Sequence, residues 1–279
     1  MSEYKQFPRT EVGGVSLPRM LIGSNWITGF SHTSHAADMD IRETNKTAED
    51  VFPIFKTFTD YGVNALMGGA PDNAVDYFQN KTGREIIKIA TPIFNMDDTK
   101  EARAETEQTI KNSAKAGAKF CFPHHSSAEQ LVNKNKRTID RLPDYLYMIR
   151  ENGMIPGLSA HMPELIIYSD LNEYDVETYI QIFNCMGFLM QIEIESIIQI
   201  IHSAKKPVMT IKPMAAGRVS PYVGLTFNWN VLRPQDMITV GVKTFWEAHE
   251  DVEISFAAFE KRLPDLEGRN SPNKTEIIK

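Results

Sequence analysis

Eight short apolar runs recur along the chain, and each ends in a small group of polar or glycine residues. In order they read RMLIGSNW, VNALMGG, IIKIATPIFN, AKFCFPHH, MIPGLSAH, TYIQIFN, PVMTIKPMAAG and MITVGVKT. Most neighbouring runs are separated by a stretch in which apolar residues recur with helical periodicity. Eight buried strands that alternate with helices predict an α/β protein with a (β/α)₈ or TIM barrel, whose chemistry lies at the carboxyl ends of the strands.

The same pattern gives bounds for most elements. We expect strands at 20–23, 63–67, 86–94, 119–122, 154–158 and 178–183, directly after Pro207, and at 237–240. We expect helices from Thr47 to a stop at Gly62, and at 72–81, 101–116, 138–151, 188–204 and 245–262. The first of these carries an apolar stripe at helical spacing, Val51, Ile54, Phe55 and Phe58. Glycines at 62, 83, 117 and 153 each precede a strand, as expected for helix stops.

Three segments lack a regular pattern. The polar stretch 24–45 is expected to be a long loop over the mouth of the barrel. Segment 163–168 is at best a short helix, and the aromatic segment 220–234 is expected to be irregular and to close over the site or serve a subunit interface. We expect residues 1–279 to form one domain, with a lead-in at about 1–18 and a polar tail at about 264–279.

Composition narrows the class of protein. The formal net charge is −6, and the basic residues are scattered among acidic ones, so nucleic acid is not an expected partner. Both cysteines, Cys121 and Cys185, fall in apolar runs and are interpreted as reduced core thiols. The first ten residues carry no apolar signal region, and no run is long enough to span a membrane. We therefore expect a cytoplasmic protein with a small-molecule substrate, and we leave open whether it forms a homo-oligomer.

Histidines gather in the tails of the strands. Five of the seven lie there or in the loop after the first strand: His32, His35, His124, His125 and His161. The other two, His202 and His249, fall in helical stretches and are interpreted as surface or packing residues. The tails also contribute further candidates for substrate binding, Asn25, Trp26, Asn95 and Asn184.

The pair His124-His125 follows the fourth strand, and His161 follows the fifth. Because neighbouring residues on a strand point to opposite sides, we expect at most one of the pair to face the barrel axis. That residue and His161 would move protons or bind a divalent metal; the alternative is that these rings only bond loop backbone. No metal-binding spacing is present, and Asp38 and Glu164 are the nearest carboxylate candidates.

Lys212 ends the seventh strand within the apolar run VMTIKP. Such a lysine either turns out to solvent or stands at the barrel mouth, where it would form a Schiff base, stabilise an enolate or bind an anionic group. The loops after the seventh and eighth strands, the usual anion site of barrels, offer Gly217, Arg218, Gly241, Lys243 and Thr244. They predict a site for a phosphate or carboxylate. The aromatic and hydroxyl-rich loop GSNWITGFSHTS suits a sugar-like ligand, or a packed lid.

The last third of the chain resembles the aldo-keto reductase superfamily. KPVMTIKPMAAGR is similar to the seventh strand of that family, and MITVGVKTFWEAHEDVE to its eighth strand and following helix, which hold the nucleotide's phosphate. The resemblance covers about a quarter of the chain. It implies a (β/α)₈ barrel that binds NADP, with Gly241, Lys243 and Thr244 at the phosphate.

The first half departs from that family. Its members carry an Asp after the second strand, a Tyr in the next helix, a Lys after the third strand and a His after the fourth. Here Met67 or Gly68 stands near the Asp, Thr91-Pro92 replaces the Lys, and Tyr77 is the nearest tyrosine. Only His124 matches.

The sequence therefore favours a TIM-barrel enzyme that acts on a small polar, anionic or sugar-like metabolite by acid–base chemistry, as a lyase, isomerase or hydrolase. His124 or His125 and His161 would move protons, and Lys212 would stabilise negative charge. The alternatives are an NADP-dependent oxidoreductase of aldo-keto reductase type and a barrel that binds a ligand without catalysis. The cofactor is left open, with neither a divalent metal nor NADP favoured.

Overall fold

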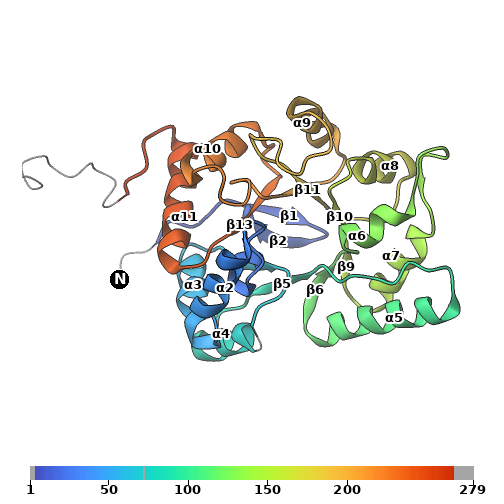
Figure 1. Ribbon diagram of the computed structural model, residues 1–279, viewed down its shortest axis with the longest axis horizontal. Coiled ribbons are helices and arrows are strands. Elements are labelled where there is room, and N and C mark those ends of the chain that lie inside the picture. Colours follow the sequence, from blue (N-terminus) through green and yellow to red (C-terminus); the bar gives the residue numbers. More distant parts are fainter. Residues whose placement is uncertain (1–3, 72, 267–279) are drawn as a thin grey trace, which may run out of the picture.

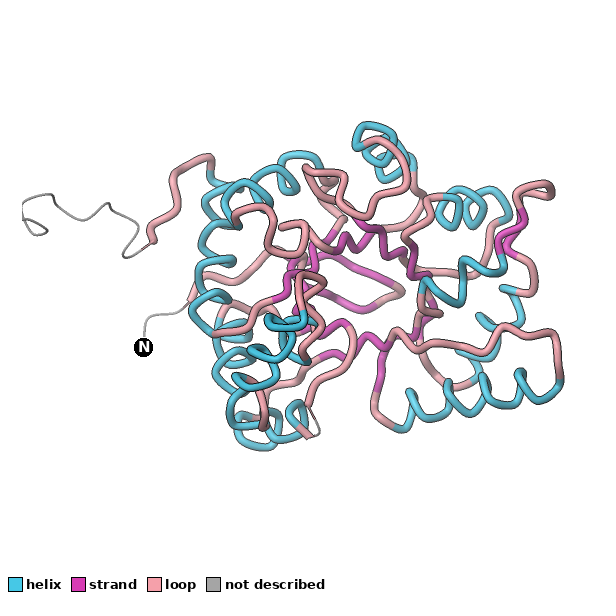
Figure 2. The backbone as a smooth tube through the Cα atoms, viewed as in Figure 1, coloured by secondary structure: helices cyan, strands magenta, loops and turns pink. Residues whose placement is uncertain are grey.

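A computed structural model describes residues 4–71 and 73–266 (Figure 1). The expected tail beyond residue 266 and the first residue of the expected helix at 72–81 lie outside the described residues. Eight parallel strand positions, called staves because one of them consists of two short strands, form a closed ring (Figure 2). They are β3 (Met20–Gly23), β4 (Ala65–Met67), β5 (Ile87–Ala90), β6 (Ala118–Cys121), β9 with β10 (Ile155–Pro156 and Leu158–Ala160), β11 (Tyr179–Ile182), β12 (Val208–Ile211) and β13 (Met237–Gly241).

The ring closes where the last strand, β13, pairs in parallel with the first, β3. The fifth stave is split by Gly157, so that β9 pairs with β6 and β10 pairs with β11. A Cβ atom at Gly157 would come within 2.5 Å of the Phe122 ring and 2.8 Å of the Thr178 carbonyl oxygen. The stave therefore needs a residue without a side chain at this point. The closed parallel sheet confirms the predicted (β/α)₈ barrel.

Helices cover the outside of the ring (Figure 1). They include α3 (Ala48–Asp60), α4 (Ala74–Thr82), α5 (Lys100–Lys115), α7 (Leu142–Glu151), α8 (Glu164–Asn172), α9 (Ile194–Ser203), α10 (Pro221–Val231) and α11 (Phe245–Glu260). Helix α3 begins at a capping box between Thr47 and Asp50 and buries the expected apolar stripe. The four glycine stops all have positive φ, between 69° and 77°, as the interpretation of them required.

A hairpin of β1 (Arg9–Val12) and β2 (Val15–Pro18) crosses the amino-terminal end of the barrel (Figure 2). Val12 and Leu17 from the hairpin are buried in one cluster with barrel residues such as Leu21, Phe120 and Met209. The lead-in thus closes the amino-terminal end of the barrel and leaves the carboxyl-terminal end open.

Two segments expected to be irregular are helical. Segment 24–45 contains α1 (Asn25–Thr28) and α2 (His35–Thr44), the latter capped by Ser34, whose hydroxyl accepts from the Ala37 amide. Segment 220–234 contains α10, which begins with Pro221 and packs against α11. The hydrophobic pattern did not predict this helix, because Leu225 and Trp229 are buried but the other faces also carry apolar residues, so no single apolar stripe stands out.

Two expected helices begin later than the pattern suggested. The segment 138–151 opens with β8 (Thr138–Ile139), which pairs with β7 (Val132–Asn133), and α7 starts at Leu142 with a proline in its first turn. The segment 188–204 is helical only from Ile194, because the Asn184 side chain accepts from the Met186 and Phe188 amides and folds the preceding loop. Conversely, α8 is longer than the short helix expected at 163–168.

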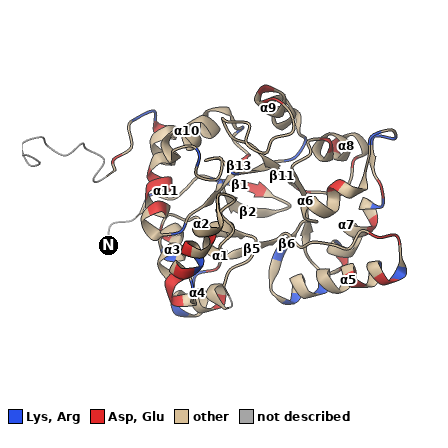
Figure 3. Cartoon of the chain, in the orientation of Figure 1, with Lys and Arg blue, Asp and Glu red and all other residues tan. Residues whose placement is uncertain are grey.

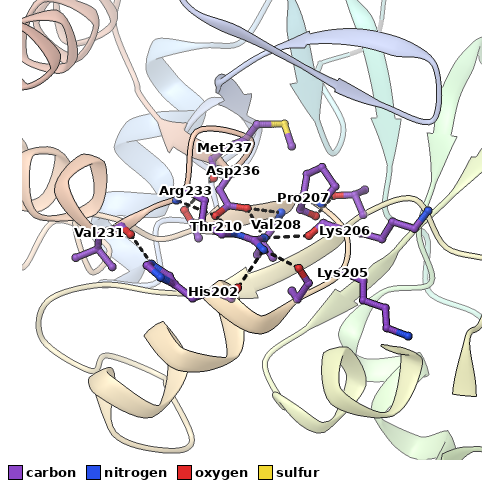
Figure 4. Close-up of polar contacts among 12 residues, drawn as sticks. His202, Lys205, Lys206, Pro207, Val208, Thr210, Val231, Arg233, Asp236 and Met237 are labelled. Atoms are coloured by element: carbon purple, nitrogen blue, oxygen red, sulfur yellow. Dashed lines mark hydrogen bonds and ion pairs between the residues drawn. The ribbon is translucent and has the colours of Figure 1, made fainter. Parts of the chain in front are cut away.

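A buried ion pair joins the amino ends of β12 and β13 (Figure 4). Asp236 is fully buried, and its carboxylate accepts from the Val208 amide and from the backbone and guanidinium of Arg233. Arg233 also donates to the carbonyl oxygens of Ala204 and Lys206. Arg233 and Asp236 thus provide hydrogen-bond partners for backbone groups in the segments that lead into both strands.

Charged residues are spread over the outer helices, with both signs interspersed (Figure 3). Among the described residues, no helix is both long and apolar enough to cross a membrane. Cys121 is buried as expected, and burial raises the pKa of its thiol to about 12, whereas Cys185 is only half-buried and lies beyond the end of β11.

Candidate functional site

A cavity of about 530 Å³ opens at the carboxyl ends of the strands. Side chains from the tails of all the staves except the sixth meet there, together with an apolar residue, Ile180, from inside that strand. Of the predicted site residues, nine line the cavity: Asn25, Trp26, His32, His124, His125, His161, Lys212, Gly217 and Gly241.

Three histidine rings stand together on one wall. The rings of His125 and His161 are stacked, with centroids 3.8 Å apart and planes 16° from parallel. The His124 ring lies 4.2 Å from that of His125. The rings come from the tails of two neighbouring staves, as the sequence predicted.

The expectation that only one of His124 and His125 would face the cavity is wrong. Strand β6 ends at Cys121, and His125 is the first residue of the short helix α6 (His125–Ala128). Alternation applies only to extended backbone, whereas consecutive residues at a helix start can project to the same side. Both rings therefore line the cavity.

Glu129 holds this wall from behind. One oxygen of its carboxylate accepts from the backbone amides of His161 and Met162, at 2.7 and 2.8 Å. The other oxygen lies 3.8 Å from Nδ1 of His125, which is too long for a hydrogen bond but close enough for attraction to a protonated ring. Glu129 therefore fixes the turn that carries His161 and faces His125 with negative charge.

The cavity disfavours protonation of two of the rings. Burial lowers the pKa of both His124 and His161 to about 4, and the neighbouring His125 and Lys212 add to the effect. The Ser126 amide donates to Nδ1 of His124, so the neutral ring carries its hydrogen on Nε2. Near neutral pH, His124 and His161 are thus uncharged imidazoles that can accept or donate a proton.

Lys212 stands on the other side of the cavity, at the end of β12. Its Nζ lies 3.3 Å from Nε2 of His32, and that nitrogen also accepts from Asn25 Nδ2 at 3.0 Å. Burial lowers the pKa of the Lys212 ammonium. The backbone of Lys212 has φ of 60°, a left-handed conformation that costs a residue with a side chain about 1–2 kcal/mol. The interpretation of Lys212 as solvent-facing therefore does not hold.

The loops after β12 and β13 are covered by Trp26. Added Cβ atoms at Gly241 and Gly217 would meet the indole at 3.0 and 3.6 Å. At the start of α11, the Glu247 carboxylate accepts from the amides of Lys243 and Thr244. A nucleotide phosphate at these amides would have to displace that carboxylate and meet its charge. These residues do not fit the NADP that the aldo-keto reductase resemblance implies.

The remaining predicted anion-site residues are not part of the cavity lining. Lys243 pairs with Asp40, and Thr244 caps α11. Arg218 lies over the Phe188 ring and donates to the His32 carbonyl, so it supports the mouth from outside.

The three other substrate-binding candidates also lie outside the cavity lining. His35 begins α2 and is exposed. Asn95 bonds Glu105, and Asn184 bonds its own loop. The tyrosine nearest to the aldo-keto reductase position, Tyr77, bonds Lys81 on the outer helix α4.

Two further expectations concern residues farther out. His202 bonds the Val231 carbonyl and His249 the Tyr61 hydroxyl, as expected of packing residues. The carboxylate candidates for a metal are taken elsewhere: Asp38 accepts from Ser31, and Glu164 pairs with Lys134. Within the described part of the chain, no three His, Cys, Asp or Glu side chains are grouped so as to hold a metal ion.

Sequence reasoning missed several groups that shape the cavity. Ser159, Thr239 and Glu247 line it, but they lie inside strands or a helix rather than in the polar tails. Glu129 was missed as well, although its spacing of four residues from His125 is the signal of a side-chain pair at the start of a helix.

Comparison of the whole chain with solved structures found barrels of the same type. A candidate aldo-keto reductase from Pseudomonas aeruginosa aligns with a TM-score of 0.67 and 13% identity, over 92% of this chain and 98% of that one. Glycerol dehydrogenase from Gluconobacter oxydans aligns with a TM-score of 0.60 and 10% identity, over 98% and 100%. An aldose reductase from Giardia lamblia gives 0.51 and 10%, over 93% and 90%.

Neither a scan against protein-family models nor a search of curated proteins gave a match. At these identities the structural likeness concerns the fold and not the reaction. The chain thus has a (β/α)₈ barrel of the kind found in aldo-keto reductases.

Proposed function

We propose that the protein is an enzyme that moves protons on a small polar, anionic or sugar-like metabolite, as a lyase, isomerase or hydrolase. The observation that carries the proposal is the stack of His125 and His161 in the same cavity as Lys212. The uncharged imidazoles of His124 and His161 and a cation at the mouth of a barrel are the groups that acid–base chemistry next to a developing negative charge requires.

Each group has a distinct role in this proposal. His161 accepts the proton, because its ring is neutral near pH 7 and its backbone is fixed by Glu129. His124 donates a hydrogen bond from Nε2 to the substrate oxygen, as the tautomer set by Ser126 allows. Lys212 stabilises the negative charge that develops on that oxygen.

The test uses variants of His161 and Lys212. Turnover of a panel of keto acids, hydroxy acids and sugar phosphates is followed by proton NMR. His161→Ala and Lys212→Ala are expected to abolish turnover while leaving the melting temperature nearly unchanged. His202→Ala, which alters a hydrogen bond outside the cavity, is the matched control and should retain turnover. A large loss of stability in both cavity variants would instead indicate structural roles.

Two other functions have weaker support. An NADP-dependent oxidoreductase needs a phosphate site where Glu247 and Trp26 lie, and a titration that shows NADPH binding by fluorescence would revive it. A barrel that only binds its ligand would gather these buried polar groups without using them, which is costly. Native mass spectrometry of the protein as purified would reveal a retained metabolite, cofactor or metal.

A further inference from the structure

Lys212 differs from a simple anion-binding lysine in its surroundings. Burial is the cause that lowers the pKa of its ammonium, with no acidic group raising it. Its one polar side-chain contact among the described residues is the His32 ring, whose pKa is lowered by burial and by Lys212 itself. The other predicted lysine at the mouth, Lys243, is paired with Asp40.

The cavity wall near Lys212 favours the neutral amine. Apolar groups of Ile211, Pro213 and Met214 line the cavity beside it. An ammonium group that loses water without gaining a carboxylate partner gives up its proton more easily, and the amine that results is a nucleophile. Lys212 is held at this place by a backbone in the left-handed region.

We propose that Nζ of Lys212 forms an imine with the carbonyl carbon of an aldehyde or ketone substrate. This inference rests on the proposed acid–base function and specifies its substrate class, with Lys212 acting as a nucleophile in place of the charge-stabilising role given to it above. It assigns the proton transfers that imine formation requires to the histidine wall, which consists of His124, His125 and His161.

The step balances without any further reactant. The neutral amine adds to the carbonyl carbon, forming a C–N bond, and the carbonyl oxygen becomes a hydroxyl when a proton moves from nitrogen to oxygen through an imidazole. The proton that remains on the nitrogen then moves through the imidazole to the hydroxyl, which leaves as water while the C–O bond breaks and the C=N bond forms. Hydrolysis reverses these steps and regenerates the lysine.

The test measures the reactivity of Lys212 in the wild-type protein. Glycolaldehyde and cyanoborohydride are added near pH 7, and the alkylated lysines are located by peptide mass spectrometry over time. Lys119, exposed on the barrel exterior, serves as the internal reference. Lys212 should be modified faster than Lys119, since a lowered pKa leaves a larger fraction of the amine neutral at the same pH. Modification no faster than that of Lys119 would overturn the proposal.

A second measurement separates this proposal from the proposed function. Lys212→Arg keeps the positive charge but cannot form an imine. If Lys212→Arg retains turnover and glycolaldehyde spares Lys212, the imine is refuted while acid–base catalysis stands. If Lys212 is selectively alkylated but His161→Ala retains turnover, the imine stands and the role of the histidines is refuted.

Discussion

Replacement of Asp236 by asparagine removes one charge from the buried pair that joins β12 and β13. The carboxylate accepts four hydrogen bonds, two on each oxygen, and the Arg233 side chain is only 12% exposed. In Asp236→Asn one oxygen remains as an acceptor, and the amide nitrogen faces the Nε and backbone donors of Arg233. Two bonds are lost, and the guanidinium is left buried without its counter-ion.

The expected cost follows from these contacts. Hydrogen bonds to charged groups contribute about 1.5–3 kcal/mol each, and breaking one partner of a buried ion pair costs about 3–5 kcal/mol. We therefore expect Asp236→Asn to lower the free energy of unfolding by about 3–4 kcal/mol. For a chain of this size that corresponds to a fall of roughly 5–7 °C in melting temperature.

The assay is urea unfolding followed by circular dichroism, with thermal unfolding alongside. The matched control is Asp144→Asn, which breaks an exposed pair with Arg103 and should cost less than ~1 kcal/mol. A free energy of unfolding for Asp236→Asn within ~1 kcal/mol of the wild-type value would show that the buried pair contributes little to stability, as would an equal loss in the control. Arg233→Met should partly restore the asparagine variant, because it removes the unpaired charge.

Two further predictions concern the pH dependence and the split stave. Because the pKa values of His124 and His161 are about 4 in the folded protein and near 6.5 when unfolded, the unfolded chain takes up protons first. Stability present above pH 6.5 should thus be lost as the pH falls towards 4. In a variant with both rings replaced by glutamine, the urea midpoint should fall less steeply with decreasing pH than in the wild type. The same dependence of the midpoint on pH in both proteins would contradict these pKa directions. Gly157→Ala should cost about 1–3 kcal/mol in the same assay by crowding Phe122, whereas Gly69→Ala, where an added Cβ meets nothing within 4 Å, should be nearly neutral; equal effects would argue against the close contact at Gly157.

The sequence predicted the barrel because its strands are buried on both faces and appear as uninterrupted apolar runs. A parallel closed sheet then brings the tails together, which is why His124, His161 and Lys212 could be assigned to one mouth. The helices α2 and α10 were missed for opposite reasons. The first is largely polar, and the second is apolar on several faces, so neither shows a clean stripe.

The candidate site was predicted less completely than the fold. Asn95 and Asn184 lie in the tails, but their amides bond neighbouring groups rather than facing the cavity. Local pairing of this kind depends on backbone turns that a hydrophobic pattern does not encode. The predicted anion site is likewise occupied by a side chain of the protein, because Glu247 lies four residues after Lys243 and its carboxylate accepts from the Lys243 amide.

The proposed function requires that the histidines of the cavity remove a proton from a bound metabolite. Its most direct test is to incubate the protein in D₂O with a panel of small aldehydes, ketones and keto acids and to follow the exchange of their carbon-bound hydrogens by proton NMR. The wild-type protein and His202→Ala should exchange the hydrogen next to the carbonyl of at least one compound, and His161→Ala should not. Exchange that continues unchanged in His161→Ala, or no exchange of any panel member by the wild-type protein, would contradict it.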